Sequence, residues 1–149
     1  MTVLVTGATG NIGKQVAAAL VARGERVRAL VRSPQRAALL PPGIEPVIGD
    51  LQDPARVEAA LTGVSAALYV SPHDAAEERL AQIFVDACER LGVRLVFAGV
   101  VLSSRNPLQR WTIWALMNTL LPHYRGKLRI ASRIARSRTK PVLFGVTNY

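Results

Sequence analysis

Residues 3–20 read VLVTGATGNIGKQVAAAL, and this stretch decides the fold. Its first three residues are apolar and mostly β-branched, which predicts a strand, and the pattern of residues 12–22 predicts a helix. Three glycines lie around the turn between them. Gly7 lets the chain leave the strand in a conformation that a Cβ would block. Gly10 lets the backbone approach a phosphate closely, and Gly13 lets the helix pack on the strand.

The order strand, glycine-rich turn, helix is the context in which a dinucleotide binds. Free N–H groups at the helix start and the positive end of its dipole favour phosphates. The glycine spacing here is G-x-x-G-x-x-G rather than G-x-G-x-x-G. The motif therefore predicts a pyrophosphate site, and the alternative is a tight strand-to-helix turn that binds nothing.

Strands and helices alternate along the rest of the chain, which predicts an α/β fold with a doubly wound parallel sheet and helices on both faces. The length of 149 residues predicts a single domain over residues 1–149. Beyond the first strand, the predicted strands cover residues 27–31, 45–48, 64–70, 93–97 and 142–146. Beyond the first helix, the predicted helices cover a short segment after Ser33-Pro34 and residues 53–61, 75–91, 107–121 and 125–137.

The composition excludes several classes of protein. Half of the residues are hydrophobic and the mean hydropathy is +0.21, which indicates a globular chain. Cys88 is the one cysteine, so no internal disulfide or cysteine metal cluster can form, and we expect a small buried thiol. His73 and His123 lack metal-ligand spacing. No signal peptide and no apolar run of the ~18 residues that a membrane span needs is visible, which predicts a cytoplasmic protein.

The charge is unevenly distributed. Residues 1–89 carry 8 Lys/Arg and 10 Asp/Glu, whereas residues 90–149 carry 11 Lys/Arg and no acid. A basic half can bind nucleic acid or anionic lipid. However, the segment has no recognised nucleic-acid motif and almost no interleaved aromatics, so we expect no nucleic-acid partner. The alternatives are a solvated face or a charge that another segment balances.

Residues 6–13 resemble the cofactor loop of the atypical short-chain dehydrogenase/reductases, especially the NmrA-like NAD(P)-binding proteins. The resemblance continues at residues 27–32, 49–51 and 141–144 and so covers nearly the whole chain. It implies a Rossmann-like fold. In that family the sixth strand is followed by much of the substrate lobe, so we expect a relative truncated after the sixth strand. The candidate cofactor-binding residues are Gly7, Thr9, Gly10, Asn11, Ile12, Gly13, Arg32, Asp50, Leu51, Val70 and Ser71.

Arg32 indicates which cofactor is preferred. It ends the second predicted strand, where an NAD-binding domain often has an acid for the ribose 2′-hydroxyl. A guanidinium can instead pair with a 2′-phosphate, which favours NADP and NADPH over NADH, with Ser33 and Arg36 as helpers. The alternative is a solvated arginine in a basic protein.

Two further pairs complete the predicted cofactor site. Asp50 and Leu51 resemble the family's adenine-side contact, where the carboxylate would accept the adenine amino proton and Leu51 would cover the ring; a simple loop is the alternative. Val70 and Ser71 end the fourth predicted strand at the carboxyl edge, where ligands of open α/β sheets bind. In the family this stretch lies along the nicotinamide ribose.

A catalytic set is harder to identify. Typical short-chain dehydrogenases use a Ser and a Tyr-x-x-x-Lys, in which the lysine lowers the tyrosine pKa. Tyr124 and Lys127 are one residue too close for that motif, although many NmrA-like proteins keep only a lysine, which Lys127 matches. Ser103 and Ser104 follow the fifth predicted strand near the position of the family serine.

These residues allow two main functions. The first is an NAD(P)H-dependent oxidoreductase that acts on a small carbonyl or quinone, and the second is a non-catalytic NADP(H)-sensing regulatory or interaction module. The helix predicted at residues 107–121 is apolar nearly all round. Because a sheet can cover only one side of it, we expect this segment to bind a second copy or a protein partner.

Overall fold

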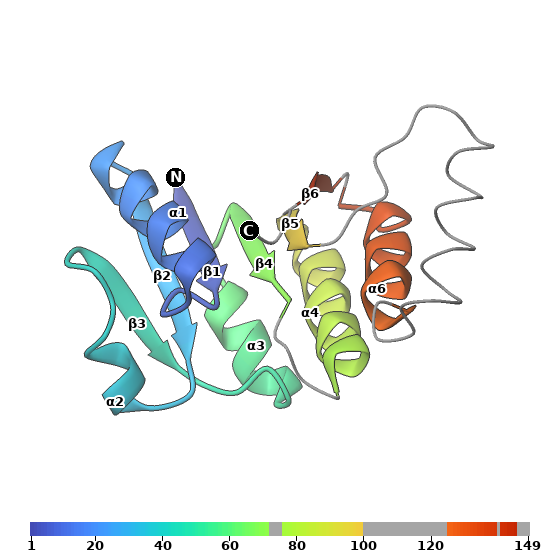
Figure 1. Ribbon diagram of the computed structural model, residues 1–149, viewed down its shortest axis with the longest axis horizontal. Helices are drawn as coiled ribbons and strands as arrows, with labels where there is room; N and C mark the ends of the chain where they lie inside the picture. The colour runs from blue at the N-terminus through green and yellow to red at the C-terminus, as the bar shows by residue number, and fades with distance from the viewer. Residues whose placement is uncertain (72–75, 100–124, 140, 146–149) are drawn as a thin grey trace.

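The computed structural model describes residues 1–71, 76–99, 125–139 and 141–145. The described residues form a six-stranded parallel sheet flanked by helices (Figure 1). This confirms the predicted doubly wound α/β fold. The strands are β1 Thr2–Thr6, β2 Arg26–Val31, β3 Ile44–Ile48, β4 Ala66–Val70, β5 Arg94–Gly99 and β6 Val142–Gly145. The helices are α1 Asn11–Ala22, α2 Pro34–Ala37, α3 Pro54–Leu61, α4 Glu77–Leu91 and α6 Arg125–Ala135.

The strand order is β3-β2-β1-β4-β5-β6, so the chain builds the sheet outward from its centre in both directions. The order in which strands are added to the sheet reverses between β1 and β4. These two strands pair in parallel from Val3 opposite Ala66 to Val5 opposite Leu68. A sheet of this kind binds ligands beyond the carboxyl ends of its strands at this switch point.

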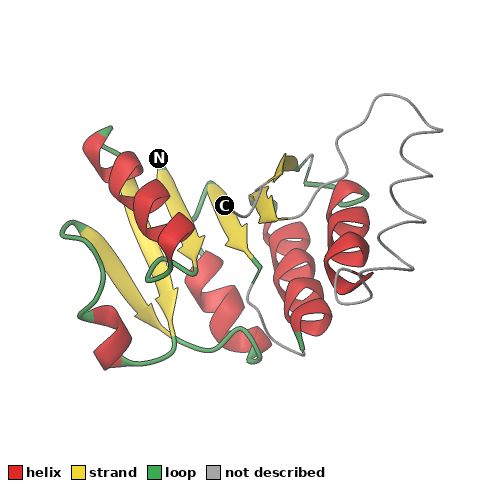
Figure 2. Cartoon of the chain, in the orientation of Figure 1, coloured by secondary structure: helices red, strands yellow, loops and turns green. Residues whose placement is uncertain are grey.

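Helices cover both faces of the sheet (Figure 2). On one face, α1 packs against a cluster that includes Val5 and Ala29. On the other face, α3, α4 and α6 pack against a larger cluster. Tyr69 of β4 is fully buried in this cluster, and its ring centroid lies 5.0 Å from that of Phe84 and 6.2 Å from that of Phe97. Four of the five β4 residues are buried, as expected for an apolar strand covered on both faces.

Local signals in the sequence start the helices as predicted. The Asp53 carboxylate accepts the N–H of Ala55 at 3.0 Å and of Arg56 at 3.2 Å, which caps α3. Ser33 caps α2 in the same way at 3.3 Å. Cys88 is fully buried, as expected, and burial followed by the nearby Glu89 raises its thiol pKa to about 12.

The basic helix α6 packs against α4, which carries acids along its length. Arg133 donates to the Gln82 side chain and the Asp86 carboxylate, both at 2.9 Å. Arg129 forms an ion pair with Glu78. Two of the positive charges near the end of the chain, Arg129 and Arg133, are therefore paired with acids of α4.

The helix predicted at residues 107–121 lies outside the described residues, and so does the apolar surface expected there. The interaction of this segment with a second copy or partner stays a prediction.

Candidate dinucleotide-binding site

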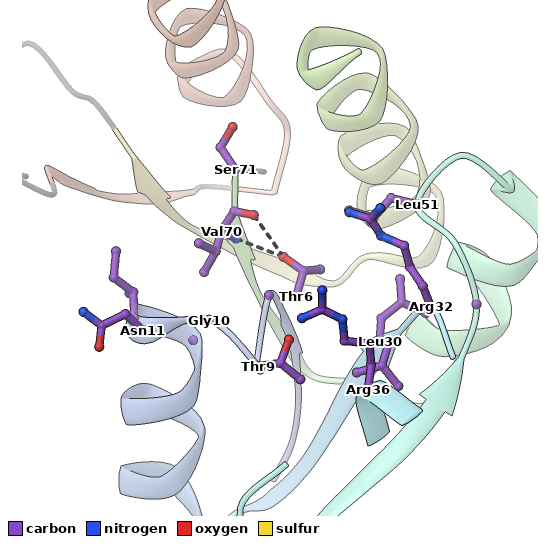
Figure 3. Close-up of a pocket in the computed structure, with 15 residues that line it drawn as sticks. Thr6, Thr9, Gly10, Asn11, Leu30, Arg32, Arg36, Leu51, Val70 and Ser71 are labelled. Carbon is purple, nitrogen blue, oxygen red and sulfur yellow. Dashed lines mark hydrogen bonds between the residues drawn. The ribbon is translucent and has the colours of Figure 1, made fainter. Parts of the chain in front are cut away.

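A cavity of about 480 Å³ lies at the switch point, at the carboxyl ends of β1, β2 and β4. Its volume falls in the range of small-molecule sites. The cavity brings together ten of the eleven predicted cofactor residues; Asp50 is the exception. The lining residues are Thr6, Gly7, Thr9, Gly10, Asn11, Ile12, Gly13, Leu30, Val31, Arg32, Arg36, Gly49, Leu51, Val70 and Ser71 (Figure 3).

The glycine turn has the geometry that its sequence predicts. Gly7 adopts a φ of +64°, a left-handed conformation that glycine tolerates best. The N–H of Gly10 donates to the Gly7 carbonyl at 2.9 Å and closes the turn. A Cβ at Gly13 would overlap the Gly7 carbonyl oxygen and lie 2.6 Å from its carbonyl carbon and 3.0 Å from Ala8 Cα. Only glycine allows α1 to start this close to β1.

The start of α1 is suited to an anion. Gly10 is the N-cap residue, so no side chain caps the helix, and its first turn contains no acid. The Asn11 side-chain oxygen accepts a hydrogen bond from Gln15 at 3.2 Å. The N–H groups of the first turn and the helix dipole therefore favour a phosphate in the adjoining cavity.

Thr6, which the sequence analysis did not select, lines the cavity and joins the end of β1 to the end of β4. Its side chain is buried, and its hydroxyl oxygen accepts the N–H of Val70 at 2.9 Å (Figure 3). The Thr6 hydroxyl oxygen lies 3.4 Å from the Leu68 carbonyl oxygen and 3.5 Å from the Val70 carbonyl oxygen. Either carbonyl can accept the hydroxyl proton. This bond continues the β1–β4 pairing past its last backbone pair. A hydroxyl residue at the end of a buried strand was the available signal.

Arg32 and Arg36 lie on the side of the cavity away from Asn11 (Figure 3). Both side chains are exposed, and within the described part of the chain neither forms an ion pair. Ser33 does not line the cavity, because its hydroxyl caps α2. Two guanidinium groups thus remain available at this end of the cavity.

Asp50 lies next to the cavity without lining it. Its carboxylate accepts the backbone N–H of Gln52 at 2.9 Å and so stabilises the local turn. Leu51 lines the cavity as predicted, and Leu30 and Gly49 add an apolar surface that the sequence analysis did not select. The contact between Asp50 and adenine stays a prediction.

The candidate catalytic residues are only partly placed. Lys127 falls in the first turn of α6, whereas Tyr124 lies outside the described residues. Ser103, Ser104, His73 and His123 lie outside them as well. In the ranges that the structure describes, no group of three or more His, Cys, Asp or Glu side chains could hold a metal ion.

None of the helices in the described ranges is both long enough and apolar enough to span a bilayer.

Comparison with known proteins links this geometry to a ligand. Residues 7–140 match a family described as NAD(P)H-binding. Over 108 residues the chain is 38% identical to sterol demethylase protein B of Methylococcus capsulatus, covering 64% of this chain and 33% of that protein. Over 100 residues it is 39% identical to a (4-alkanoyl-5-oxo-2,5-dihydrofuran-3-yl)methyl phosphate reductase of Streptomyces griseus, covering 66% of this chain and 35% of that protein.

A solved structure shares the fold. The NADPH-dependent quinone oxidoreductase QOR2 of Escherichia coli, crystallised with NADPH, aligns with a TM-score of 0.62 and 25% identity. The alignment covers 76% of this chain and 44% of that one. The present chain therefore spans about a third of the length of the two curated relatives and less than half of this structure.

Proposed function

This chain belongs to the NAD(P)H-binding family. We propose that it binds NADP(H) and is an NAD(P)H-dependent oxidoreductase that acts on a small carbonyl or quinone. The glycine turn, the uncapped start of α1 and a cavity of about 480 Å³ fit a dinucleotide. The pyrophosphate would lie at Gly10 and the first turn of α1. The adenosine half would lie toward Arg32 and Leu51.

One observation carries the preference for NADP(H): two arginines, and no acid, line the cavity at the end of β2. A 2′-phosphate can accept hydrogen bonds from the guanidinium of Arg32, with Arg36 as its neighbour. An NAD-specific site would have a carboxylate here to accept the 2′-hydroxyl.

The reaction class follows from the cofactor and from the relatives. Bound NADPH supplies a hydride, and the protein holds and shields the cofactor. The Streptomyces griseus relative is named a reductase and the Escherichia coli structure a quinone oxidoreductase, which supports reduction of a carbonyl or quinone. Lys127 and Tyr124 are the candidates for the proton donor, and their roles stay a proposal, as does the cytoplasmic location.

The test of cofactor choice is Arg32→Asp. We expect the affinity for NADPH to fall on the order of 10- to 100-fold, because a hydrogen bond to a charged group contributes roughly 1.5–3 kcal/mol and the new carboxylate repels the phosphate. The affinity for NADH should stay the same or rise. Titration of both cofactors by isothermal calorimetry measures this difference.

Arg26→Asp is the matched control, since Arg26 begins the same strand at the opposite edge of the sheet and does not line the cavity. It should leave both affinities unchanged. Equal affinity of the wild-type protein for NADPH and NADH would refute the preference, and no binding of either would refute the proposed function.

A further inference from the structure

A second cavity, of about 680 Å³, lies at the amino ends of the strands, whereas the dinucleotide cavity described above lies at their carboxyl ends. Its lining includes Ala66 at the start of β4, Arg94 at the start of β5 and Val142 at the start of β6. Its volume falls in the range of small-molecule sites. The two cavities share no lining residue, so a ligand in the second cavity would not compete with a dinucleotide in the first.

The floor of the second cavity is apolar and comes from three neighbouring strands. Ala66 of β4 is the register partner of Arg94 of β5, and Val96 of β5 is the register partner of Val142 of β6. Because register partners share a face and side chains alternate along a strand, all four side chains lie on one face of the sheet. The floor therefore presents Ala66, Val96 and Val142 together, with Arg94 beside them.

This face of the sheet is open over β6. Val142 is 44% exposed and Val96 is half-buried, although parallel strands are normally covered on both faces. On the same face, α1 packs over β1, β2 and β3, and its hydrophobic cluster includes Val96 but not Val142. The apolar floor is thus accessible to a ligand.

The rim of the second cavity is cationic. Arg94 and Arg138 line it and are exposed, and neither forms an ion pair within the part of the chain that the structure describes. The Glu89 carboxylate also lines the cavity and accepts the backbone N–H of Arg138 at 3.1 Å. The Met1 ammonium group is paired with Glu25 at 2.6 Å. The lining therefore carries one positive charge in excess.

We propose that the second cavity binds an amphipathic carboxylate, with its hydrocarbon chain on the floor and its carboxylate paired with Arg94. A guanidinium can pair with a carboxylate through two parallel hydrogen bonds. A ligand with one negative charge and an apolar body matches a lining with one excess positive charge and an apolar floor. The proposal does not rest on the proposed function, because the two cavities are separate.

The experiment uses decanoate as the probe, below its micelle-forming concentration, and measures its affinity for the whole chain by calorimetry with and without saturating NADPH. We expect binding in both conditions, with a Kd that NADPH changes by less than about twofold, because the lining residues differ. Decyltrimethylammonium has a chain of the same length and a positive charge, and it should bind roughly tenfold more weakly. Octanoate, with a shorter chain, should bind roughly five- to fifteenfold more weakly, since it buries fewer CH₂ groups.

Two variants test the rim and the floor. Arg94→Gln removes a charge from the rim and should weaken decanoate binding roughly three- to tenfold. Val142→Thr keeps the branched shape but places a hydroxyl on the floor, and it should weaken binding roughly two- to fivefold. Arg26→Gln is the matched control, because Arg26 begins β2 as Arg94 begins β5, is also exposed and lines neither cavity. It should leave the affinity for decanoate unchanged.

Each outcome decides the proposal. Decanoate that does not bind, or that NADPH displaces, would overturn it. Equal affinity for decyltrimethylammonium would overturn it as well, and so would an Arg94→Gln variant that loses no more affinity than Arg26→Gln. A chain that binds decanoate but neither NADPH nor NADH would refute the proposed function and leave this proposal standing.

Discussion

Between Gly7 and Gly13 each contact that closes the turn joins residues no more than six positions apart, whereas the hydrogen bonds between α4 and α6 join side chains about fifty positions apart. The turn is built from backbone atoms and from the absence of side chains. The polar contact between the helices is made by long, partly exposed side chains, and it accompanies the apolar packing of Ile130 and Ile134 in the core cluster that α4 shares. The first region lines the dinucleotide cavity, whereas no described residue of α4 or α6 does.

This difference predicts how each region responds to change. The backbone atoms of the turn are closely packed, and a single added methyl group meets atoms that cannot move independently. A contact made by partly exposed side chains can rearrange, and water and salt replace some of what is lost. Substitutions in the turn should therefore cost more than substitutions of the charged side chains between α4 and α6.

The largest effect is expected for Gly13→Ala. The new Cβ would overlap the Gly7 carbonyl group, so α1 must move away from β1. Such overpacking costs about 3 kcal/mol of unfolding free energy. Denaturant unfolding followed by circular dichroism measures it. Gly63→Ala is the control, because Gly63 has a positive φ but no atom within 4 Å of an added Cβ, and it should cost only about 1 kcal/mol. Equal losses in both variants would contradict this account of the turn.

An intermediate effect is expected for Thr6→Val, which replaces the hydroxyl by a methyl of similar size. The Val70 N–H then loses its acceptor in a partly buried position, at a cost of about 1–3 kcal/mol. Because the same bond fixes β4 against the glycine turn, NADPH should also bind more weakly. Thr6→Ser keeps the hydroxyl and should recover most of both losses. A serine variant as damaged as the valine variant would show that the methyl group, not the hydrogen bond, matters.

A smaller effect is expected between α4 and α6. The Arg133 and Asp86 side chains are 41% and 37% exposed, so solvent screens their ion pair. A double-mutant cycle with alanine at both positions should give a coupling free energy of about 0.5–1 kcal/mol, and high salt should reduce it. A coupling that salt does not change would indicate that packing rather than charge joins the helices.

The smallest effect concerns Glu89, near the C-terminal end of α4. The backbone N–H of Arg138, and then the Ser137 hydroxyl, hold the pKa of Glu89 below its ordinary value. A carboxyl group whose pKa is lowered on folding stabilises the protein above its ordinary pKa, and that contribution is lost as the pH falls through the lowered value. Glu89→Gln should therefore flatten the acid side of the stability curve, measured as Tm between pH 7 and about pH 3. An unchanged curve would show that this contact contributes no measurable stability.

Much of the site could be predicted from the sequence, because a phosphate-binding turn is a local object. The three glycines, the preceding apolar strand and Arg32 lie within the first 32 residues, and each has a meaning that its neighbours alone supply. Thr6 was missed because its hydroxyl acquires a role only when Val70, 64 residues later, is placed beside it. Asp50 was selected from the sequence, but its carboxylate stabilises its own turn and does not line the dinucleotide cavity.

The sequence by itself determined the parallel sheet and the position of the dinucleotide turn, because hydrophobic periodicity and glycine geometry act over a few residues at a time. Only the tertiary structure decided what the charges do. The sequence left open whether the basic residues near the end of the chain are solvated or balanced by another segment, and Arg129 and Arg133 meet the acids of α4. Electrostatic interactions depend on distance through space, and that distance is set by the packing of α4 against α6 and β4 rather than by the order of residues.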